Sequence, residues 1–248
     1  MEQVRISKIL SELGLCSRRE ADKYIEQGLV LLDGKVVNQL GTKASRNQKV
    51  ELLNKAKKNQ SLKATIILNK PVGFISHLDD KKDFKPASTL IIPTNFYNLS
   101  NKEDKQRRNP IFNTDGLAPA GRLDIDSSGL LILTQDGRIA KKIIGEESTE
   151  IEKEYLVRVE GGITDKELKL LNHGMTIDEY KLKPAKVIWQ NKDQLNFVLI
   201  EGRNRQIRKM CALVGLSVKG LKRVRIGNIR LGDLPDGKWR FLSEVESF

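Results

Sequence analysis

The stretch that most constrains how this chain folds is GRLDIDSSGLLILT, at residues 121–134. Its apolar end, Leu130–Leu133, is long enough for a buried strand and too short for an independent helix. Gly121 and Gly129 permit tight backbone at both ends of the acidic segment before the strand. We therefore expect Asp124 to lie on a loop held rigidly by a sheet. The competing interpretation, which the pattern alone favours, is a turn whose aspartates only accept backbone hydrogen bonds.

The chain carries a large positive charge. Its 248 residues contain 44 Lys and Arg against 32 Asp and Glu, which gives a formal net charge of +12. Such an excess indicates a polyanionic partner, either nucleic acid or an acidic membrane surface. No apolar run approaches the roughly 18 residues that would span a bilayer. We therefore expect no membrane association and favour nucleic acid.

The cysteines and the N-terminus indicate the compartment. Cys16 and Cys211 lie far apart without a CxxC spacing, and we interpret both as small buried apolar residues in a reducing environment. The first residues, MEQVRISKIL, contain no signal-peptide core, so we expect a cytoplasmic protein. His77 and His173 complete no familiar zinc pattern with the cysteines, and we expect no metal site.

Residues 1–52 have the pattern of a small domain with two helices and a hairpin. Ser17 and Glu20 match a capping box at the start of the second helix. Asp33-Gly34 lies between two β-prone runs, which is a strong hairpin signal. Basic side chains on these helices either form a solvated face or bind phosphate, which exposed backbone N–H groups also favour. The candidate phosphate contacts are Arg5, Arg18, Arg19 and Lys23.

The rest of the chain divides into a linker and a larger domain. Residues 53–63 are polar and lysine-rich, and we interpret them as a linker that tolerates motion. The larger domain then covers 64–248. Within it, residues 79–116 show no clear period and indicate a long loop or an insertion, in part disordered. The basic run at 105–108 is either a solvated loop or a contact with nucleic acid.

Regular patterns return in the second half of the chain. Three β-prone runs predict strands at 154–159, 185–189 and 195–200. An amphipathic helix follows over 207–214, with Asn204 as its expected cap. At about 100° per residue, Arg208 borders the buried stripe of this helix, whereas Arg205 lies roughly opposite it. Arg208 can therefore reach a partner under the sheet, whereas Arg205 would meet solvent or nucleic acid.

Four residues form a candidate site: Arg122, Asp124, Tyr155 and Arg208. They offer an anionic nucleophile or base, a cation that keeps it ionised, and an aromatic platform for a planar substrate. No phosphate-binding glycine loop, nucleophile elbow or metal set accompanies them, so hydrolysis is poorly supported. We assign the neighbouring Asp126 to the structure of the loop.

Several segments resemble known families. The stretch from Leu15 to Lys35 resembles the small RNA-binding domain named after ribosomal protein S4. Segments of the larger domain resemble the pseudouridine synthases of the RsuA, RluB, RluE and RluF group, at 68–73, 121–124, 153–157 and 203–210. The C-terminal segments at 221–226 and 237–240 are most similar to RluF-like members.

The resemblance implies a fold and a reaction. The fold would be α+β, with a small N-terminal helical and hairpin RNA-binding domain and a larger catalytic domain around a mixed, mostly antiparallel sheet. The catalytic cleft would cross the middle of that sheet. The reaction would convert a uridine of ribosomal RNA to pseudouridine in a monomeric enzyme without a cofactor, and large-subunit (23S) rRNA is the favoured target. A small-subunit (16S) rRNA or tRNA target, or a non-catalytic RNA-binding or ribosome-assembly protein, are the alternatives.

The resemblance also implies roles for the site residues. Asp124 would be the essential carboxylate, which either attacks the anomeric carbon or removes a proton. Arg208 would be its salt-bridge partner, Tyr155 would pack against the uracil, and Arg122 would occupy the space left by a flipped uridine. Flipping is required because the reacting atoms are inaccessible in a stack. The arginines expected to contact RNA beside this site are Arg203 and Arg205.

Overall fold

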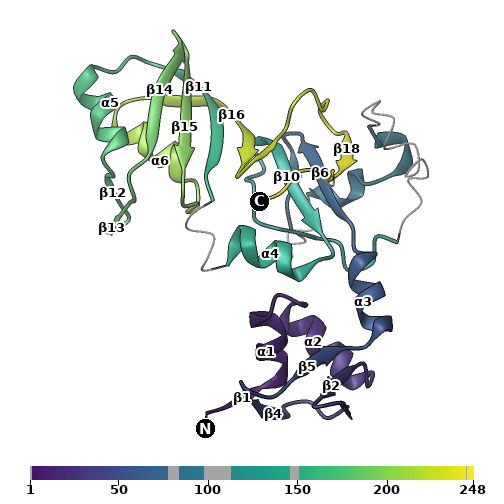
Figure 1. The fold of residues 1–248 in the computed structure, drawn as a ribbon. Helices are drawn as coiled ribbons and strands as arrows, with labels where there is room; N and C mark the ends of the chain where they lie inside the picture. The colour runs from purple at the N-terminus through teal and green to yellow at the C-terminus, as the bar shows by residue number, and fades with distance from the viewer. Residues whose placement is uncertain (1, 78–83, 98–112, 146–150, 244) are drawn as a thin grey trace.

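The computed structural model describes residues 2–77, 84–97, 113–145, 151–243 and 245–248. An N-terminal module is joined by a helix to a larger domain that is built around one sheet (Figure 1). Within the stretch 79–116, residues 79–83 and the basic run at 105–108 lie outside the described residues.

The N-terminal module follows the pattern that its sequence predicts. Its elements are β1 (Gln3–Arg5), α1 (Ile6–Glu12), α2 (Arg18–Glu26), β2 (Val30–Leu32), β3 (Lys35–Val37), β4 (Lys43–Ser45) and β5 (Val50–Leu52). The capping box is present, because the Ser17 hydroxyl accepts from the backbone N–H of Glu20 while the Glu20 side chain accepts from that of Ser17. Asp33 and Gly34 both have positive φ angles, as the tight β2–β3 hairpin requires.

Most of the segment expected as a linker, residues 53–63, is a helix. Helix α3 (Asn54–Ser61) follows β5 directly. It buries Ala56 and Gln60 despite its high lysine content. The Gln60 amide accepts from the Tyr24 hydroxyl of the module and donates to Asp136 of the larger domain. The helix thus bonds to both domains, which its polar composition alone did not indicate.

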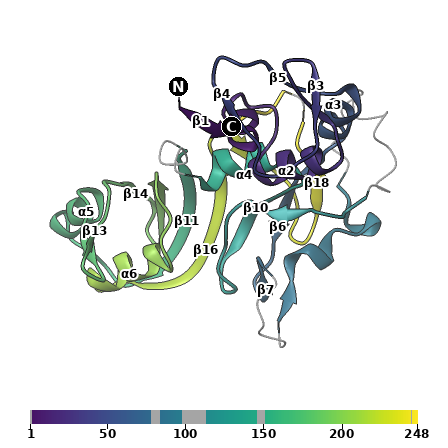
Figure 2. The same ribbon diagram turned by 90° about the horizontal axis from the view of Figure 1, so that it is seen from below.

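The larger domain contains a mixed, mostly antiparallel sheet, and the predicted α+β fold is confirmed. The strand order is β14-β15-β11-β16-β10-β6-β18, with β9 paired to β10 and β17 paired to β16. The strands are β6 (Thr65–Lys70), β9 (Ala118–Pro119), β10 (Ser128–Thr134), β11 (Lys153–Glu160), β14 (Lys186–Asn191), β15 (Gln194–Leu199), β16 (Ser217–Ile226), β17 (Ile229–Arg230) and β18 (Trp239–Phe241). Figure 2 shows β16 as a long curved strand between the two ends of the sheet.

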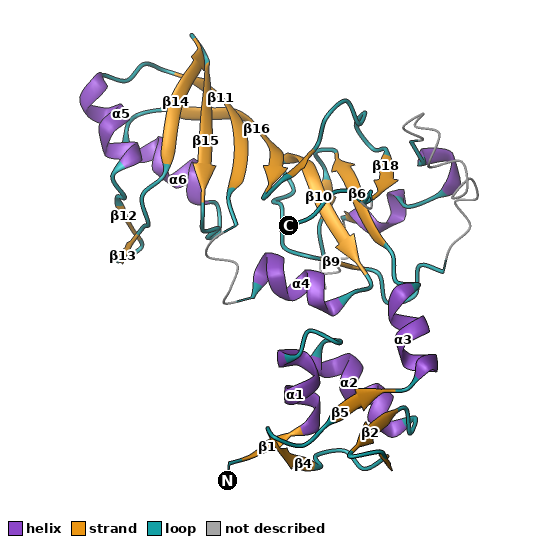
Figure 3. Ribbon diagram, in the orientation of Figure 1, coloured by secondary structure: helices purple, strands orange, loops and turns teal. Residues whose placement is uncertain are grey.

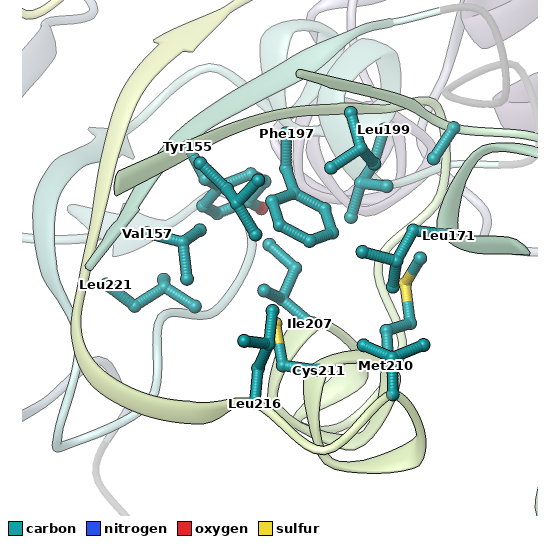
Figure 4. Close-up of a cluster of buried hydrophobic side chains, with 14 of the residues drawn as sticks. Tyr155, Val157, Leu171, Phe197, Leu199, Ile207, Met210, Cys211, Leu216 and Leu221 are labelled. Carbon is teal, nitrogen blue, oxygen red and sulfur yellow. The ribbon is translucent and has the colours of Figure 1, made fainter. Parts of the chain in front are cut away.

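Helices and short segments cover the sheet (Figure 3). They are α4 (Gly137–Ile144), α5 (Asp165–Asn172) and α6 (Gln206–Leu213), with the small pairs β12 (Thr176–Ile177) and β13 (Tyr180–Lys181), and β7 (Phe74–Ile75) and β8 (Lys85–Pro86). One core lies between α6 and strands β11 and β15, where Tyr155, Phe197 and Ile207 meet (Figure 4).

Strand β10 is buried on both faces, which explains its continuous apolar run. Leu130 and Ile132 pack in one cluster with Ile143 of α4. Leu131 and Leu133 point into a different cluster on the other face, around Trp239. Alternating side chains of one strand thus enter two cores, so each needs to be apolar.

Residues 84–97, part of the stretch expected as a long loop or an insertion, contribute to the second of these cores. This segment forms β8 and two short 3₁₀ turns, Ala87–Leu90 and Pro93–Asn95. The Trp239 indole donates to the Ile92 carbonyl at 2.9 Å, and Phe96 stacks at 4.9 Å from the Trp239 ring. The segment had no clear period in the sequence because its ordered parts are turns that pack one residue at a time.

The two parts of the sheet meet at a short parallel joint. Only Ser128↔Lys222 and Gly129↔Arg223 pair there, whereas the other neighbouring strands of this sheet run antiparallel. Gly129 has a φ of +103°, and a Cβ on it would lie 2.2 Å from the Arg223 carbonyl oxygen. Only glycine fits this position, because both the dihedral angle and the space exclude a side chain. The joint places the acidic loop at the middle of the sheet.

Candidate active site

The acidic loop before β10 is fixed along its whole length. Five consecutive backbone carbonyls each accept a hydrogen bond from a different partner. The pairs are Arg122 with Arg223 Nη1, Leu123 with Ser76 Oγ, Asp124 with Ser127 N, Ile125 with Gly73 N, and Asp126 with Arg208 Nη2. Ser76 Oγ also accepts from the N–H of Leu123 at 2.9 Å. These bonds fix the backbone of the loop and thus the positions from which its side chains project. This agrees with the rigid loop that we expected from the glycines and the strand.

A cavity of about 540 Å³ opens beside this loop. This volume lies within the usual range for small-molecule and cofactor sites. The sheet strands β11 and β16, the loop and helix α6 all contribute to its wall. The predicted residues that line it are Arg122, Asp124, Tyr155, Arg203, Arg205 and Arg208. The structure thus brings together side chains that are up to 86 positions apart, from 122 to 208 in the sequence.

Asp124 itself is half-buried, and its side chain is free for a ligand. Within the described part of the chain, its carboxylate accepts no hydrogen bond, although the backbone carbonyls of residues 122–126 all accept one. Asp124 begins a turn, because its carbonyl accepts from the N–H of Ser127, but its carboxylate takes no part in that turn. Tyr155 lies at the edge of the core on β11, where its ring packs beside Phe197 (Figure 4).

Arg208 is paired with Asp126 rather than with Asp124, which corrects the expected salt bridge. Its Nη2 lies 3.3 Å from the Asp126 carboxylate and donates to the Asp126 carbonyl at 2.9 Å. Arg205 donates to the same carboxylate at 3.0 Å. Burial alone would raise the pKa of Asp126, but the hydrogen bond from Arg205 and the charge of Arg208 together hold it below the ordinary value. Asp126 therefore anchors the loop to helix α6.

The angular argument for Arg205 is wrong because the helix begins after this residue, whereas its expected contact with solvent or nucleic acid stays a prediction. Arg205 is the residue before α6 and has a left-handed conformation with φ 52°. Angular spacing around a helix therefore does not apply to it, and its guanidinium turns toward Asp126 instead of away from the cavity. The expected cap is also wrong, since Asn204 makes no capping bond. Gln206 accepts from the backbone N–H of Arg203 at 2.9 Å instead.

Lys70 is a charged residue near the site to which the sequence assigned no role. Its side chain is fully buried, and its ammonium group donates to the carbonyls of Pro71 and Phe74 at 2.9 Å each. Burial and the like charge of Arg223 lower the pKa of Lys70 to about 8, while Asp124 and Asp126 act in the opposite direction. Asp124 thus lies within the field of a buried cation.

Other polar residues that line the cavity were also missed, among them His77, Ser127, Lys153 and Arg223. Strand alternation could have found Lys153, because it lies two positions before Tyr155 on β11 and therefore on the same face. Arg223 is directly opposite Tyr155 across the β11–β16 pair. The segment around Arg223 alternates basic and apolar residues, and this pattern gave no sign that Arg223 is buried.

The four candidate phosphate contacts of the N-terminal module are on its surface. The residues Arg5, Arg18, Arg19 and Lys23 are all exposed. The module also touches the larger domain through Glu20, whose carboxylate accepts from the Gly137 N–H at 3.1 Å and pairs with Lys63. Burial alone would raise the pKa of Glu20, but Lys63 and the N–H groups of Ser17 and Gly137 lower it to about 2.

Comparison with known proteins shows the family to which this chain belongs. The RNA pseudouridylate synthase family matches residues 64–213, and the S4 domain matches residues 4–50. The chain belongs to the RNA pseudouridine synthases. This confirms the family, the enzyme class and the N-terminal RNA-binding domain that the sequence motifs indicated.

Curated relatives narrow the type of pseudouridine synthase. The dual-specificity RNA pseudouridine synthase RluF of Escherichia coli K12 is 37% identical over 98% of this chain and 77% of its own. An RNA pseudouridine synthase of Aquifex aeolicus is 36% identical over 99% of this chain and 93% of its own. Ribosomal large subunit pseudouridine synthase B of Bacillus subtilis is 34% identical over 98% of this chain and 93% of its own. The enzyme is thus of the RsuA/RluB/RluF type with an S4 domain.

A solved structure agrees with the fold. The crystal structure of a pseudouridylate synthase superposes with a TM-score of 0.62 at 24% identity, and covers 97% of this chain and 96% of its own. None of the described helices of this synthase is long and apolar enough to cross a membrane.

Proposed function

We propose that this pseudouridine synthase isomerises a specific uridine of large-subunit (23S) ribosomal RNA, with Asp124 as the essential carboxylate. The observation that carries the assignment is the contrast between the two aspartates of the loop. Asp126 is engaged by two arginines, whereas the carboxylate of Asp124 lines the cavity with no hydrogen bond to another described residue. A reacting carboxylate needs this combination of a fixed backbone and an available side chain.

The other side chains of the cavity suit a flipped nucleotide. Tyr155 offers the edge and face of an aromatic ring for contact with uracil. Arg122 is exposed on the loop two residues before Asp124, where it can fill the space that the flipped uridine leaves in the RNA. Arg208, through its bonds to Asp126, positions the loop rather than the reacting carboxylate itself. Arg203 and Arg205 are exposed at the rim and can bind phosphate.

The reaction conserves every atom. The C1′–N1 bond of uridine breaks, the uracil turns, and C5 bonds to C1′. C5 then loses its proton to a base, and N1 gains one. Asp124 either attacks C1′ or removes a sugar proton to allow the first cleavage, and both routes need a carboxylate at this position.

The basic surface of the S4 domain and the names of the relatives together support large-subunit rRNA as the proposed target. The S4 domain presents Arg5, Arg18, Arg19 and Lys23 to solvent, which suits the phosphates of a structured RNA. The Bacillus subtilis relative is named for the large ribosomal subunit, whereas the RluF relatives are named for dual specificity.

One experiment tests the carboxylate and the target together. In vitro transcripts of 23S rRNA, 16S rRNA and tRNA are incubated with the wild type, Asp124→Asn and Asp193→Asn, and pseudouridine is mapped chemically. We expect modification of a uridine in 23S rRNA by the wild type and by Asp193→Asn, which changes an exposed turn residue. Asp124→Asn should bind the RNA but give no product. Equal modification by Asp124→Asn would overturn the carboxylate, and product only in 16S rRNA or tRNA would overturn the target.

A further inference from the structure

Arg223 is a buried arginine whose hydrogen-bonding capacity is only partly used. It is 4% exposed and lines the same cavity as Asp124. Its Nε donates to the Leu130 carbonyl at 2.8 Å, and its Nη1 donates to the Arg122 carbonyl at 3.1 Å. Its Nη2 is buried and has no hydrogen-bond partner among the described residues. A buried donor without a partner is costly, so its retention beside a cavity points to a ligand atom.

Lys153 adds a second cation to this side of the cavity. It also lines the cavity, two residues before Tyr155 on β11. Its ammonium group has three N–H donors, and the one hydrogen bond found for it, to the Ile151 carbonyl, is long at 3.4 Å. Burial and the like charge of Arg223 lower the pKa of Lys153. The two cations are therefore close enough to interact, and they have donors to spare.

The strand register places Arg223 beside Tyr155. Tyr155 is the cross-strand partner of Arg223, and Gly129 of β10 is the partner of Arg223 on its other side. Arg223 thus lies between the aromatic ring and the beginning of the strand that follows the Asp124 loop. The hydroxyl of Ser127, at the end of that loop, is also buried, has no hydrogen-bond partner in the described ranges and lines the cavity. Unused donors of Arg223, Lys153 and Ser127 thus line the same cavity as Tyr155.

The reaction creates a negative charge that such donors can bind. When the C1′–N1 bond breaks heterolytically, its electron pair leaves with the uracil, and the charge spreads to the two carbonyl oxygens of the ring. The same electron pair then forms the C5–C1′ bond. The ring is therefore an anion between the two steps and has to stay in the cavity. Fixed cationic donors that face a developing charge are a strong source of rate enhancement.

We propose that Arg223 and Lys153 bind the carbonyl oxygens of the uracil and stabilise the uracil anion between cleavage and reattachment. This inference rests on the proposed function, since it takes the Asp124 cavity as the place of reaction. It assigns to both residues direct contact with the departing base, in addition to the bonds by which Arg223 holds the loop.

Variants of Lys153 test the proposal with the least damage to the fold. Lys153→Met keeps the length of the side chain and removes its charge, and Lys153→Arg keeps the charge. Lys222→Met is the matched control, because Lys222 lies on β16, does not line the cavity and pairs with Asp236 at 3.7 Å. Arg223→Lys serves as a second probe that keeps the charge but cannot make both loop contacts. RNA binding is measured for each variant beside the single-turnover rate.

A comparison of two substrates separates stabilisation of the uracil anion by Lys153 from a purely structural role of this residue. The uridine transcript is compared with one that contains 5-fluorouridine, whose ring carries negative charge more readily. Because C5 of that ring carries fluorine and has no proton to lose, the rate compared on both transcripts is that of C1′–N1 cleavage and C5–C1′ bond formation, before the final proton loss. We expect Lys153→Met to lower the rate on uridine about 100-fold, as for loss of one charge-stabilising donor, but less than about tenfold on 5-fluorouridine. Lys153→Arg should restore most of the rate, and Lys222→Met should change neither rate. RNA affinity should stay within about twofold of the wild type for Lys153→Met, since the defect is in the rate.

The outcomes distinguish this inference from the proposed function. An equal loss for Lys153→Met on both substrates, or a loss of RNA binding that accounts for the lower rate, would overturn the anion-binding role. In that case Asp124→Asn would still be inactive and the proposed function would stand. Retention of the wild-type rate by Asp124→Asn would instead remove the cavity as the site of reaction, whatever the Lys153 variants do.

Discussion

Arg208 binds Asp126 twice, through the carboxylate at 3.3 Å and through the backbone carbonyl at 2.9 Å. The arginine comes from helix α6, and the aspartate comes from the loop before β10, so the pair joins two parts of the domain that are 82 positions apart in the chain. Asp124 lies two residues earlier and is left to face the cavity. One aspartate of the loop therefore holds the structure, and the other is available for chemistry.

This division predicts opposite effects for the same substitution at the two positions. Asp126→Ala should lower the free energy of unfolding by about 1–2 kcal/mol, because Arg208 and Arg205 lose a shared partner. Asp124→Ala should change it by less than about 0.5 kcal/mol, since no hydrogen bond to the carboxylate is lost. Urea unfolding measures both values.

Activity should depend more on Asp124 than on Asp126, which is the reverse of the order expected for stability. Asp124→Ala should form no pseudouridine, whereas Asp126→Ala should retain a reduced, measurable rate. A stable, inactive Asp126→Ala together with an active Asp124→Ala would reverse the assignment of the two carboxylates.

The sequence predicted those features of the structure whose cause is local. The capping box of Ser17 and Glu20, the Asp33-Gly34 hairpin and the strand after the acidic loop all depend on neighbouring residues, and all are present. The family motifs likewise indicated which residues would line one cavity. Local pattern was sufficient there because each feature is decided within one element or one turn.

The contacts between distant segments could not be predicted in the same way. Two aspartates separated by one residue are equally plausible partners for Arg208, and only the path of the loop decides between them. Arg223 resembles an exposed strand residue in the sequence, yet it is buried because β10 and β11 lie on both sides of it. The angular spacing of a helix did not apply to Arg205, because this residue has a left-handed conformation and precedes the first residue of α6.

Gly129 is predicted to be indispensable to the joint of the sheet. Gly129→Ala combines a positive φ with a Cβ that would lie 2.2 Å from the Arg223 carbonyl oxygen. We expect it to cost more than about 3 kcal/mol of stability, because a backbone clash adds to the roughly 1–2 kcal/mol of left-handed strain. Gly116→Ala is the control, since Gly116 has a φ of +74° and nothing within 4 Å. Equal costs for the two variants, measured by urea unfolding, would show that the close approach of the strands does not matter.

Gly137 is predicted to report on the contact between the S4 domain and the catalytic domain. Its φ is not positive, so alanine at this first position of α4 would ordinarily stabilise the helix by about 0.5–1 kcal/mol. In this structure, however, a Cβ on Gly137 would lie 2.4 Å from that of Ser17 in the other domain. Gly137→Ala should therefore separate the domains, and small-angle scattering should give a larger radius of gyration.

The matched control for this variant is Gly162→Ala. Gly162 also lacks a positive φ and has nothing within 4 Å of its would-be Cβ. It should leave the scattering unchanged. If Gly137→Ala were more stable than the wild type and equally compact, the S4 domain would not be docked on α4 in solution.

The same contact should make stability depend on pH through Glu20. Its pKa is about 2 in the folded protein against an ordinary value of 4.5. A lowered pKa stabilises the fold fully above the ordinary value, and the contribution is lost as the pH falls from about 4.5 through about 2. The wild type should therefore lose its advantage over Glu20→Gln in this range, as urea midpoints measured at several pH values would show. Glu26→Gln, an exposed change on the same helix, serves as the control. A difference between wild type and Glu20→Gln that does not vary with pH would contradict the role of the charge.

The exposed arginines of α2 are predicted to supply affinity and not turnover. Arg18→Gln and Arg19→Gln should each weaken binding of the rRNA transcript and lower the slope of log K against log salt by roughly 0.7–0.9, the value for one phosphate contact. The rate at saturating RNA should not change, because these residues do not line the cavity. Lys49→Gln removes a charge from the same domain, but that charge is already paired with Glu51 at 3.0 Å, so its slope should match the wild type. Slopes that are unchanged for both arginine variants would mean that the RNA lies elsewhere on the S4 domain.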